Sequence, residues 1–83
     1  MTKQETINKV KRLYDKLGER KISEGSDFEL WYDTDESGAK LTEKIVGLGM
    51  DGDELCAIGE TLVFPLEELS KRELETLYSL VKK

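Results

Sequence analysis

The residues whose types and spacing come closest to a known chemistry are Asp33, Asp35 and Ser37. Oxygen ligands at alternate positions, followed by a glycine such as Gly38, are how a calcium-binding EF-hand loop begins. The match then ends, because lysines stand where that loop has an apolar residue and its bidentate glutamate. We therefore interpret residues 33–38 as an acidic turn between strands, and we keep weak calcium binding at Asp33, Asp35 and Ser37 as an alternative.

Two other features could carry chemistry. Glu43 and Glu60 fall opposite each other in the strand pairing that we predict below, and paired carboxylates can perform acid–base catalysis. Cys56 is a potential nucleophile, but the chain has no histidine to activate its thiol. An exposed acid pair and a buried, inert thiol are the simpler interpretations. We therefore expect no catalytic activity, no cofactor and no dedicated metal site.

The elements that position these residues are organised around residues 40–64, which we predict to form two antiparallel strands joined by a tight turn at Asp51 and Gly52. Asp-Gly between apolar runs is a strong hairpin signal, because a type I′ turn needs positive φ at both central residues. The resulting register pairs Met50 with Asp53, Leu48 with Leu55, Val46 with Ala57 and Ile45 with Ile58.

Both faces of this hairpin are apolar. One carries Val46, Leu48, Leu55 and Ala57, and the other carries Leu41, Ile45, Cys56, Ile58 and, if the strand continues, Leu62 and Phe64. Gly47 and Gly49 indicate a bulge or a close approach of other backbone. At Gly59 and Glu60 we favour a kink or bulge over a second reversal, which would make residues 61–64 a fourth strand.

Helices flank the hairpin at both ends of the chain. Capping boxes at residues 2–5 and 70–73 precede apolar stripes and predict helices over 3–17 and 71–82. Alternation over 27–33 predicts a strand. Residues 19–26 form a loop in this prediction, with a short strand near Ile22, and residues 66–69 form one helical turn.

These elements predict a single small α+β domain over residues 1–83. Its order is helix, strand, strand, strand, an optional short strand, and helix. The antiparallel sheet has three or four strands, and both helices pack on one face. The other face stays partly apolar, which indicates self-association; the interface candidates are Trp31, Val46, Leu48 and Leu55. Trp31 lies on the less apolar side of its strand, where we favour burial in the monomer, although exposure would make it a binding hot spot.

Charge is divided unevenly along the chain, whose net charge is −5. Residues 1–21 hold seven Lys and Arg against three acids, whereas residues 22–69 hold two lysines against thirteen acids. Lys9, Arg12 and Lys16 form a basic helix face, which we interpret as solvated; a docking surface for an anionic partner is the alternative. The acidic middle permits a nucleic-acid mimic that occupies a basic groove on another protein.

Residues 69–77, Leu-Ser-Lys-Arg-Glu-Leu-Glu-Thr-Leu, resemble the first helix of a LuxR-type helix-turn-helix. No turn and recognition helix follow within these 83 residues, and that second helix is what reads DNA. We interpret the resemblance as two sequences that satisfy the same capping and amphipathic rules, and we do not expect nucleic acid as the partner.

A chain of 83 residues is expected to form one domain, and small domains often gain stability by oligomerisation. One cysteine excludes an intrachain disulfide, and we find no signal peptide and no apolar run long enough to span a membrane. We expect a cytoplasmic protein-interaction or regulatory module that forms a homodimer through its sheet. The alternatives are a nucleic-acid mimic or nucleic-acid-associated protein, and a weak calcium binder.

Overall fold

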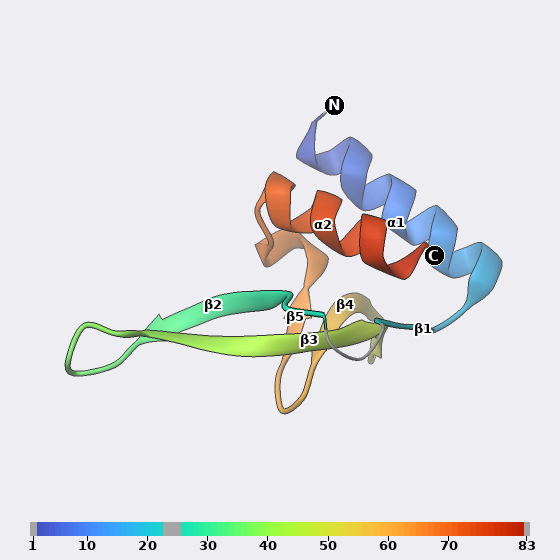
Figure 1. Ribbon diagram of the computed structural model, residues 1–83. Coiled ribbons are helices and arrows are strands. Elements are labelled where there is room, and N and C mark those ends of the chain that lie inside the picture. Colours follow the sequence, from blue (N-terminus) through green and yellow to red (C-terminus); the bar gives the residue numbers. More distant parts are fainter. Residues whose placement is uncertain (1, 23–25, 83) are drawn as a thin grey trace.

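The computed structural model describes residues 2–22 and 26–82, so part of the predicted loop at 19–26 lies outside the described residues. Its elements are α1 (Lys3–Leu17), β1 (Arg20–Lys21), β2 (Glu29–Thr34), β3 (Lys40–Asp51), β4 (Glu54–Gly59), β5 (Val63–Pro65), the 3-10 turn η1 (Leu66–Glu68) and α2 (Lys71–Val81) (Figure 1). The predicted α+β class is confirmed, and the described residues form five antiparallel strands in place of the predicted three or four.

Both helices begin at the predicted capping boxes. The Thr2 and Ser70 side chains accept from the backbone N–H of Glu5 and Glu73, and each glutamate reaches back to the backbone N–H of its cap. Helix α1 ends at Leu17 and is capped by Gly18, whose φ of 75° favours glycine. Local sequence therefore determines where these helices begin and where α1 ends.

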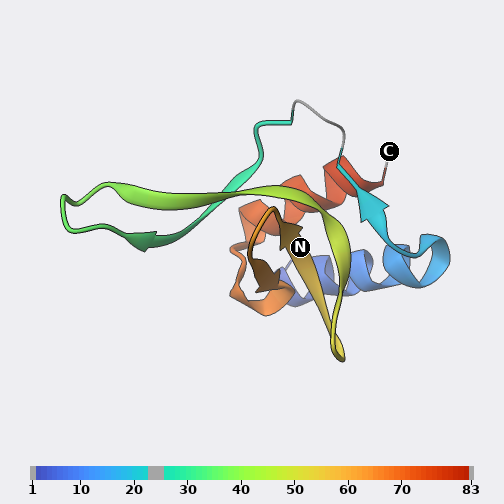
Figure 2. The same ribbon diagram turned by 90° about the horizontal axis from the view of Figure 1, so that it is seen from below.

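The core lies between the two helices and one face of the sheet (Figures 1 and 2). Its largest fully buried side chains are Val10, Ile45, Leu48, Leu74, Leu77 and Val81, together with Cys56. Arg20 ties the short strand β1 to this layer, because its Nε donates to the carbonyl of Val81 at 3.0 Å. The prediction that both helices pack on one face is confirmed.

The central hairpin is present, but its predicted register is wrong by two residues. Asp51 pairs with Glu54 and Leu48 pairs with Ala57, so the turn residues are Gly52 and Asp53. Gly52 has a φ of 63°, and no described residue other than glycine has positive φ. This is the φ pattern of a type II′ turn, which takes glycine at its first central position, rather than of the type I′ turn that we predicted.

A second reversal follows β4, so the predicted kink at Gly59 and Glu60 is wrong and the alternative is right. Ile58 pairs with Val63 and Ala57 with Phe64 in an antiparallel β4–β5 ladder. The Gly59 N–H donates to the Leu62 carbonyl at 2.7 Å and closes the turn.

A bulge in β3 changes which side chains face the core. The register shifts between Ile45 and Gly47, and Ile45 joins Leu48 in the core although the two were predicted on opposite faces. Phe64 also reaches the core face, because the β4–β5 reversal places it opposite Ala57. The predicted grouping of Ile45 and Phe64 with Cys56 and Ile58 is therefore wrong. A period-two pattern cannot reveal a one-residue insertion in a strand.

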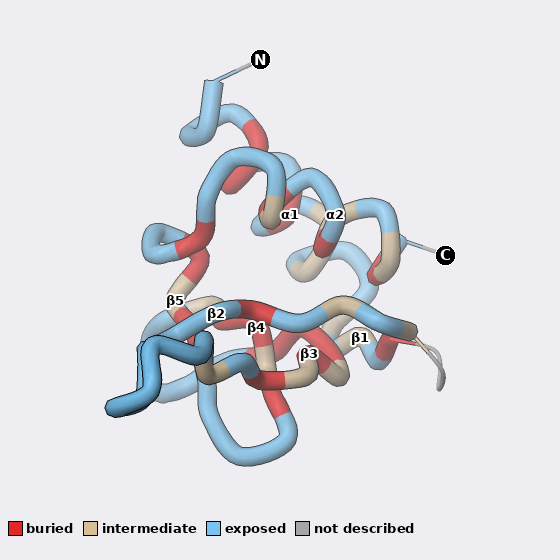
Figure 3. The backbone as a smooth tube through the Cα atoms, turned by 60° about the vertical axis from the view of Figure 1, so that its left-hand side comes forward, coloured by how far each residue is buried: buried red, intermediate tan, exposed pale blue. Residues whose placement is uncertain are grey.

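The N-terminal half of β3 extends beyond the helices, where it pairs with β2 (Figure 1). We call residues 29–44 the β2–β3 arm. The arm makes the molecule elongated, with extents of 43 × 28 × 24 Å along its principal axes. Every residue from 31 to 40 is exposed, and Figure 3 shows the outer arm in pale blue. A two-stranded ribbon without a covering layer is marginal by itself, which makes the arm a candidate contact element.

Candidate interaction surfaces

Trp31 stands on the β2–β3 arm with 56% of its surface exposed, so the predicted burial of this residue is wrong. It alternates with Leu30, which is 2% exposed and belongs to the core. Successive side chains of a strand point to opposite faces, and Trp31 therefore lies on the face away from the core. Its indole N–H donates to the backbone carbonyl of Asp33, and Lys40 Nζ lies 5.6 Å from its ring centroid.

Tyr32 is the second exposed aromatic residue of the arm, with 45% of its surface accessible. The β2–β3 register shifts between Trp31 and Asp33, which places Tyr32 in a bulge. Its ring centroid lies 6.4 Å from that of Phe64, a core residue. The arm is thus anchored to the body through Tyr32, whereas Trp31 is turned outward.

The remaining interface candidates are distributed differently from the prediction. Leu48 is 1% exposed and belongs to the core, so it is not part of an open interface. Leu55 is half-buried and packs against the core, and Val46 is half-buried beside the bulge. The helix-free face instead exposes Val63, at 41%, which pairs with the half-buried Ile58.

Glu43 does not form a carboxylate pair with Glu60. Its Oε2 accepts from the backbone N–H groups of Thr61 and Leu62, both at 2.5 Å, and both carboxylate oxygens accept from the Thr61 hydroxyl. These hydrogen bonds lower the pKa of Glu43, against the opposing effect of burial. Glu60 is exposed. Glu43 therefore closes the β4–β5 turn, and the paired-acid hypothesis has no geometric support.

The acidic turn at the tip of the arm is closed by its own side chain. Asp35 Oδ1 accepts from the Ser37 N–H at 2.9 Å, the Ser37 hydroxyl at 2.6 Å and the Ala39 N–H at 3.0 Å. Among residues 2–22 and 26–82, no three His, Cys, Asp or Glu side chains gather as a metal site. Calcium binding at Asp33, Asp35 and Ser37 stays a prediction that this geometry does not favour.

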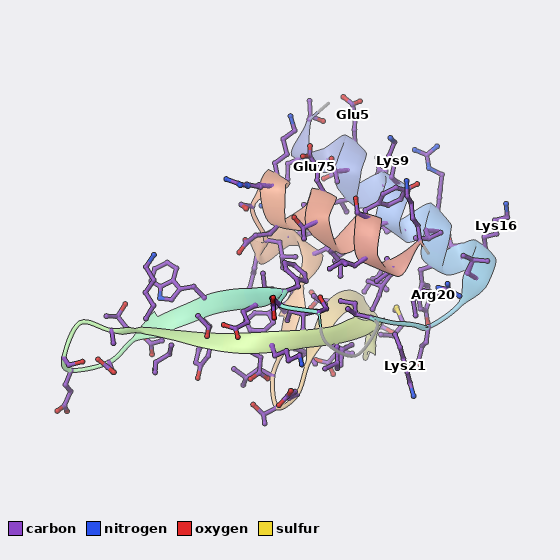
Figure 4. All side chains as sticks on the ribbon, viewed as in Figure 1. Glu5, Lys9, Lys16, Arg20, Lys21 and Glu75 are labelled. Atoms are coloured by element: carbon purple, nitrogen blue, oxygen red, sulfur yellow. The ribbon has the colours of Figure 1, made fainter. Side chains whose placement is uncertain are left out.

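The basic face of α1 includes residues with contacts of their own. Lys9 Nζ lies 5.8 Å from the ring centroid of Tyr78 in α2, and Arg12 Nε donates to the Asn8 carbonyl. Figure 4 shows Lys9 and Lys16 projecting from the same helical layer as Glu5 and Glu75. Because acids are interspersed with cations on this layer, the anionic-partner hypothesis gains no support from the arrangement and stays a prediction.

The sequence prediction missed an open groove of about 460 Å³ between α1, the β3–β4 turn and η1. Its apolar lining consists of Ile7, Tyr14, Met50, Leu55, Pro65 and Leu66. These residues come from distant parts of the chain, so no local pattern could have joined them. The acidity of residues 51–54 and 67–68 was the available signal, but it carries no information about the hollow beneath them.

Cys56 is fully buried on the strand between Leu55 and Ala57, as expected for an inert thiol. Burial raises the pKa of the Cys56 thiol, and the nearby carboxylates of Asp51 and Glu54 add to the effect. The reactive form of cysteine is the thiolate, so this environment suppresses nucleophilic chemistry.

Comparison of the chain with protein-family models, with curated proteins and with solved structures gives no match. Neither helix of the described part of the chain has the length and apolar character that crossing a bilayer requires. The arm, the groove and the distribution of charge are therefore the features of the molecule that bear on its function.

Proposed function

We propose that this protein is a small, non-catalytic interaction module that self-associates through the Trp31 face of its β2–β3 arm. The observation that carries the proposal is the 56% exposure of Trp31 on a strand that projects beyond the helices. Exposed tryptophan is among the commonest hot-spot residues of protein interfaces.

A second copy is the partner that the charges around Trp31 favour. By strand alternation, the Trp31 face also carries Glu29, Lys40 and Lys44, so both signs of charge lie beside one aromatic anchor. In a two-fold contact the same patch meets itself, and Glu29 of one copy can approach a lysine of the other. A patch of a single sign would repel its own copy.

The contact must extend beyond the aromatic residues. A stable interface buries about 800 Å² on each partner, several times the area of one tryptophan side chain. The helix-free face supplies further apolar surface at Ile58 and Val63. We therefore place the interface along the arm and onto this face.

Sedimentation equilibrium from micromolar to millimolar concentration tests the proposal. The wild-type chain should reach twice the monomer mass, and Trp31→Ala should stay monomeric. Leu17→Ala is the matched control, because Leu17 is 45% exposed but lies at the C-terminal end of α1. A wild-type monomer throughout, or equal dimerisation of Trp31→Ala, would contradict the proposal.

The single tryptophan gives an independent readout. If Trp31 becomes buried between copies, its emission maximum should move to longer wavelength when the protein is diluted. If the mass doubles but the emission maximum does not depend on concentration, the interface lies outside the Trp31 face of the arm.

A further inference from the structure

We propose that the groove between α1, the β3–β4 turn and η1 binds a basic peptide segment that carries a bulky apolar anchor. We call this site the tip groove. Its volume of about 460 Å³ lies within the range of pockets that bury a drug-sized ligand. The site is separate from the Trp31 face and does not depend on self-association.

The floor of the tip groove is suited to an apolar anchor. Ile7 and Leu66 are each 2% exposed, so they are packed into the protein at the bottom of the groove. Met50 is 42% exposed, so its side chain is accessible to a ligand. Methionine is flexible and polarisable, so it adapts to different apolar partners. Tyr14 adds an aromatic wall from α1. An entering Phe or Leu side chain would find apolar contact on several sides.

The rim of the tip groove selects the charge of the partner. Its charged residues are Asp15, Asp53, Glu54 and Glu67, with Lys11 as the cation. All five are exposed, so these charges stand at the mouth of the groove rather than among its buried side chains. Four acids against one base repel an acidic ligand and attract Lys and Arg on either side of an apolar anchor.

The walls of the groove are held in place by hydrogen bonds on two sides. Lys3 Nζ donates to the Glu67 carbonyl at 2.5 Å, which ties η1 to the start of α1. The β3–β4 turn is fixed by the ladder that ends at the Asp51–Glu54 pair. Pre-formed walls reduce the ordering cost of binding, which favours a short linear segment as the ligand.

Calorimetric titration with the peptide Lys-Lys-Phe-Leu-Lys-Lys tests the proposal on the full chain. Two peptides serve as matched ligands: one has Glu in place of every Lys, and one has Ser in place of Phe and Leu. The basic apolar peptide should bind, and both matched peptides should bind at least about tenfold more weakly. Equal binding of the Ser peptide would show that only charge attraction drives binding, and this would overturn the proposal. Free lysine or a polyamine binding as tightly as the peptide would also overturn it.

Charge reversal locates the site. Glu54→Lys with Glu67→Lys should weaken binding by roughly tenfold, because two attractive rim contacts become repulsive. The control is Glu36→Lys with Glu60→Lys, which changes net charge equally at exposed positions outside the groove. Equal weakening by both double variants, or amide shifts outside α1, the β3–β4 turn and η1, would overturn the assignment. The wild-type comparison of peptides remains decisive if a variant fails to fold, and the Trp31→Ala variant should bind the peptide normally.

Discussion

Glu43 in β3 accepts a hydrogen bond at 2.5 Å from the backbone N–H of Thr61, eighteen residues further along the chain. The same carboxylate accepts from Leu62, and Gly59 leaves the space that the Glu43 side chain occupies, since a Cβ there would meet Glu43 Cγ. A single acid thus joins the arm to the β4–β5 turn. Glu43→Gln keeps one accepting oxygen for the two N–H groups but removes the negative charge that strengthens these hydrogen bonds, and we expect a lower Tm. Glu60→Gln, an exposed neighbour in the same turn, is the control and should leave the Tm unchanged in thermal denaturation.

The Glu43 interaction should also make stability depend on pH. Hydrogen bonding lowers the pKa of Glu43 in the folded protein below its ordinary value of 4.5, so the unfolded chain takes up the proton more readily. The stabilisation is therefore complete above pH 4.5 and is lost as the pH falls through the lower, folded-state pKa. The Tm difference between wild type and Glu43→Gln should shrink over that interval. A Tm difference that stays constant as the pH is lowered through this interval would show that the charge of Glu43 is not what stabilises the turn.

Two glycines in β3 should respond differently to the same substitution. A Cβ at Gly47 would clash with the backbone carbonyl oxygen of Arg20, whereas a Cβ at Gly49 would make ordinary contact at 3.4 Å with Ile58 Cγ1. Gly47→Ala must displace β1, and we expect a loss of about 1–3 kcal/mol in unfolding free energy. Gly49→Ala should cost less than Gly47→Ala. Urea denaturation of both variants measures the difference. Equal losses of unfolding free energy would mean that β1 moves aside without a cost in stability.

The contrast between elements shows what local sequence can predict. The limits of α1 and the start of α2 follow from capping boxes and apolar stripes, which act within a few residues. The hairpin was predicted because Asp51-Gly52 is a local signal, but its register depends on which turn residue takes positive φ. The bulge beyond Ile45 brings Gly47 close to Arg20, and the second reversal brings Gly59 close to Glu43; no local pattern records either contact.

The candidate sites follow the same division. Asp35 was recognised as a turn residue because its hydrogen-bond partners lie within four positions. The exposure of Trp31 could not be predicted, since it depends on how far β3 extends beyond the helices. The role of Glu43 was missed because its partners belong to a turn that our prediction did not favour. Long-range geometry therefore determines each site that the residues alone did not reveal.

Cys56 should resist modification in the folded protein. It is fully buried, and burial raises the pKa of its thiol, so few molecules present an accessible thiolate at neutral pH. We expect alkylation by iodoacetamide to be roughly a thousandfold or more slower than in denaturant, because only unfolded molecules react. The control is a small thiol reagent applied in urea, where modification should be complete. Rapid labelling of the native chain would show that β4 opens locally.

The tip of the arm should depend on Asp35 and not on its neighbour Glu36. Asp35 Oδ1 accepts from the N–H groups of Ser37 and Ala39, and the side-chain hydrogen bond from Ser37 is the main cause of its lowered pKa. In Asp35→Ala these amides lose their acceptor, so their hydrogen exchange should accelerate while the global Tm changes little, because the tip lies outside the core. Glu36→Ala removes an exposed acid of the same turn and should leave the two amides protected. Equal acceleration in both variants would show that the turn is held by its backbone alone.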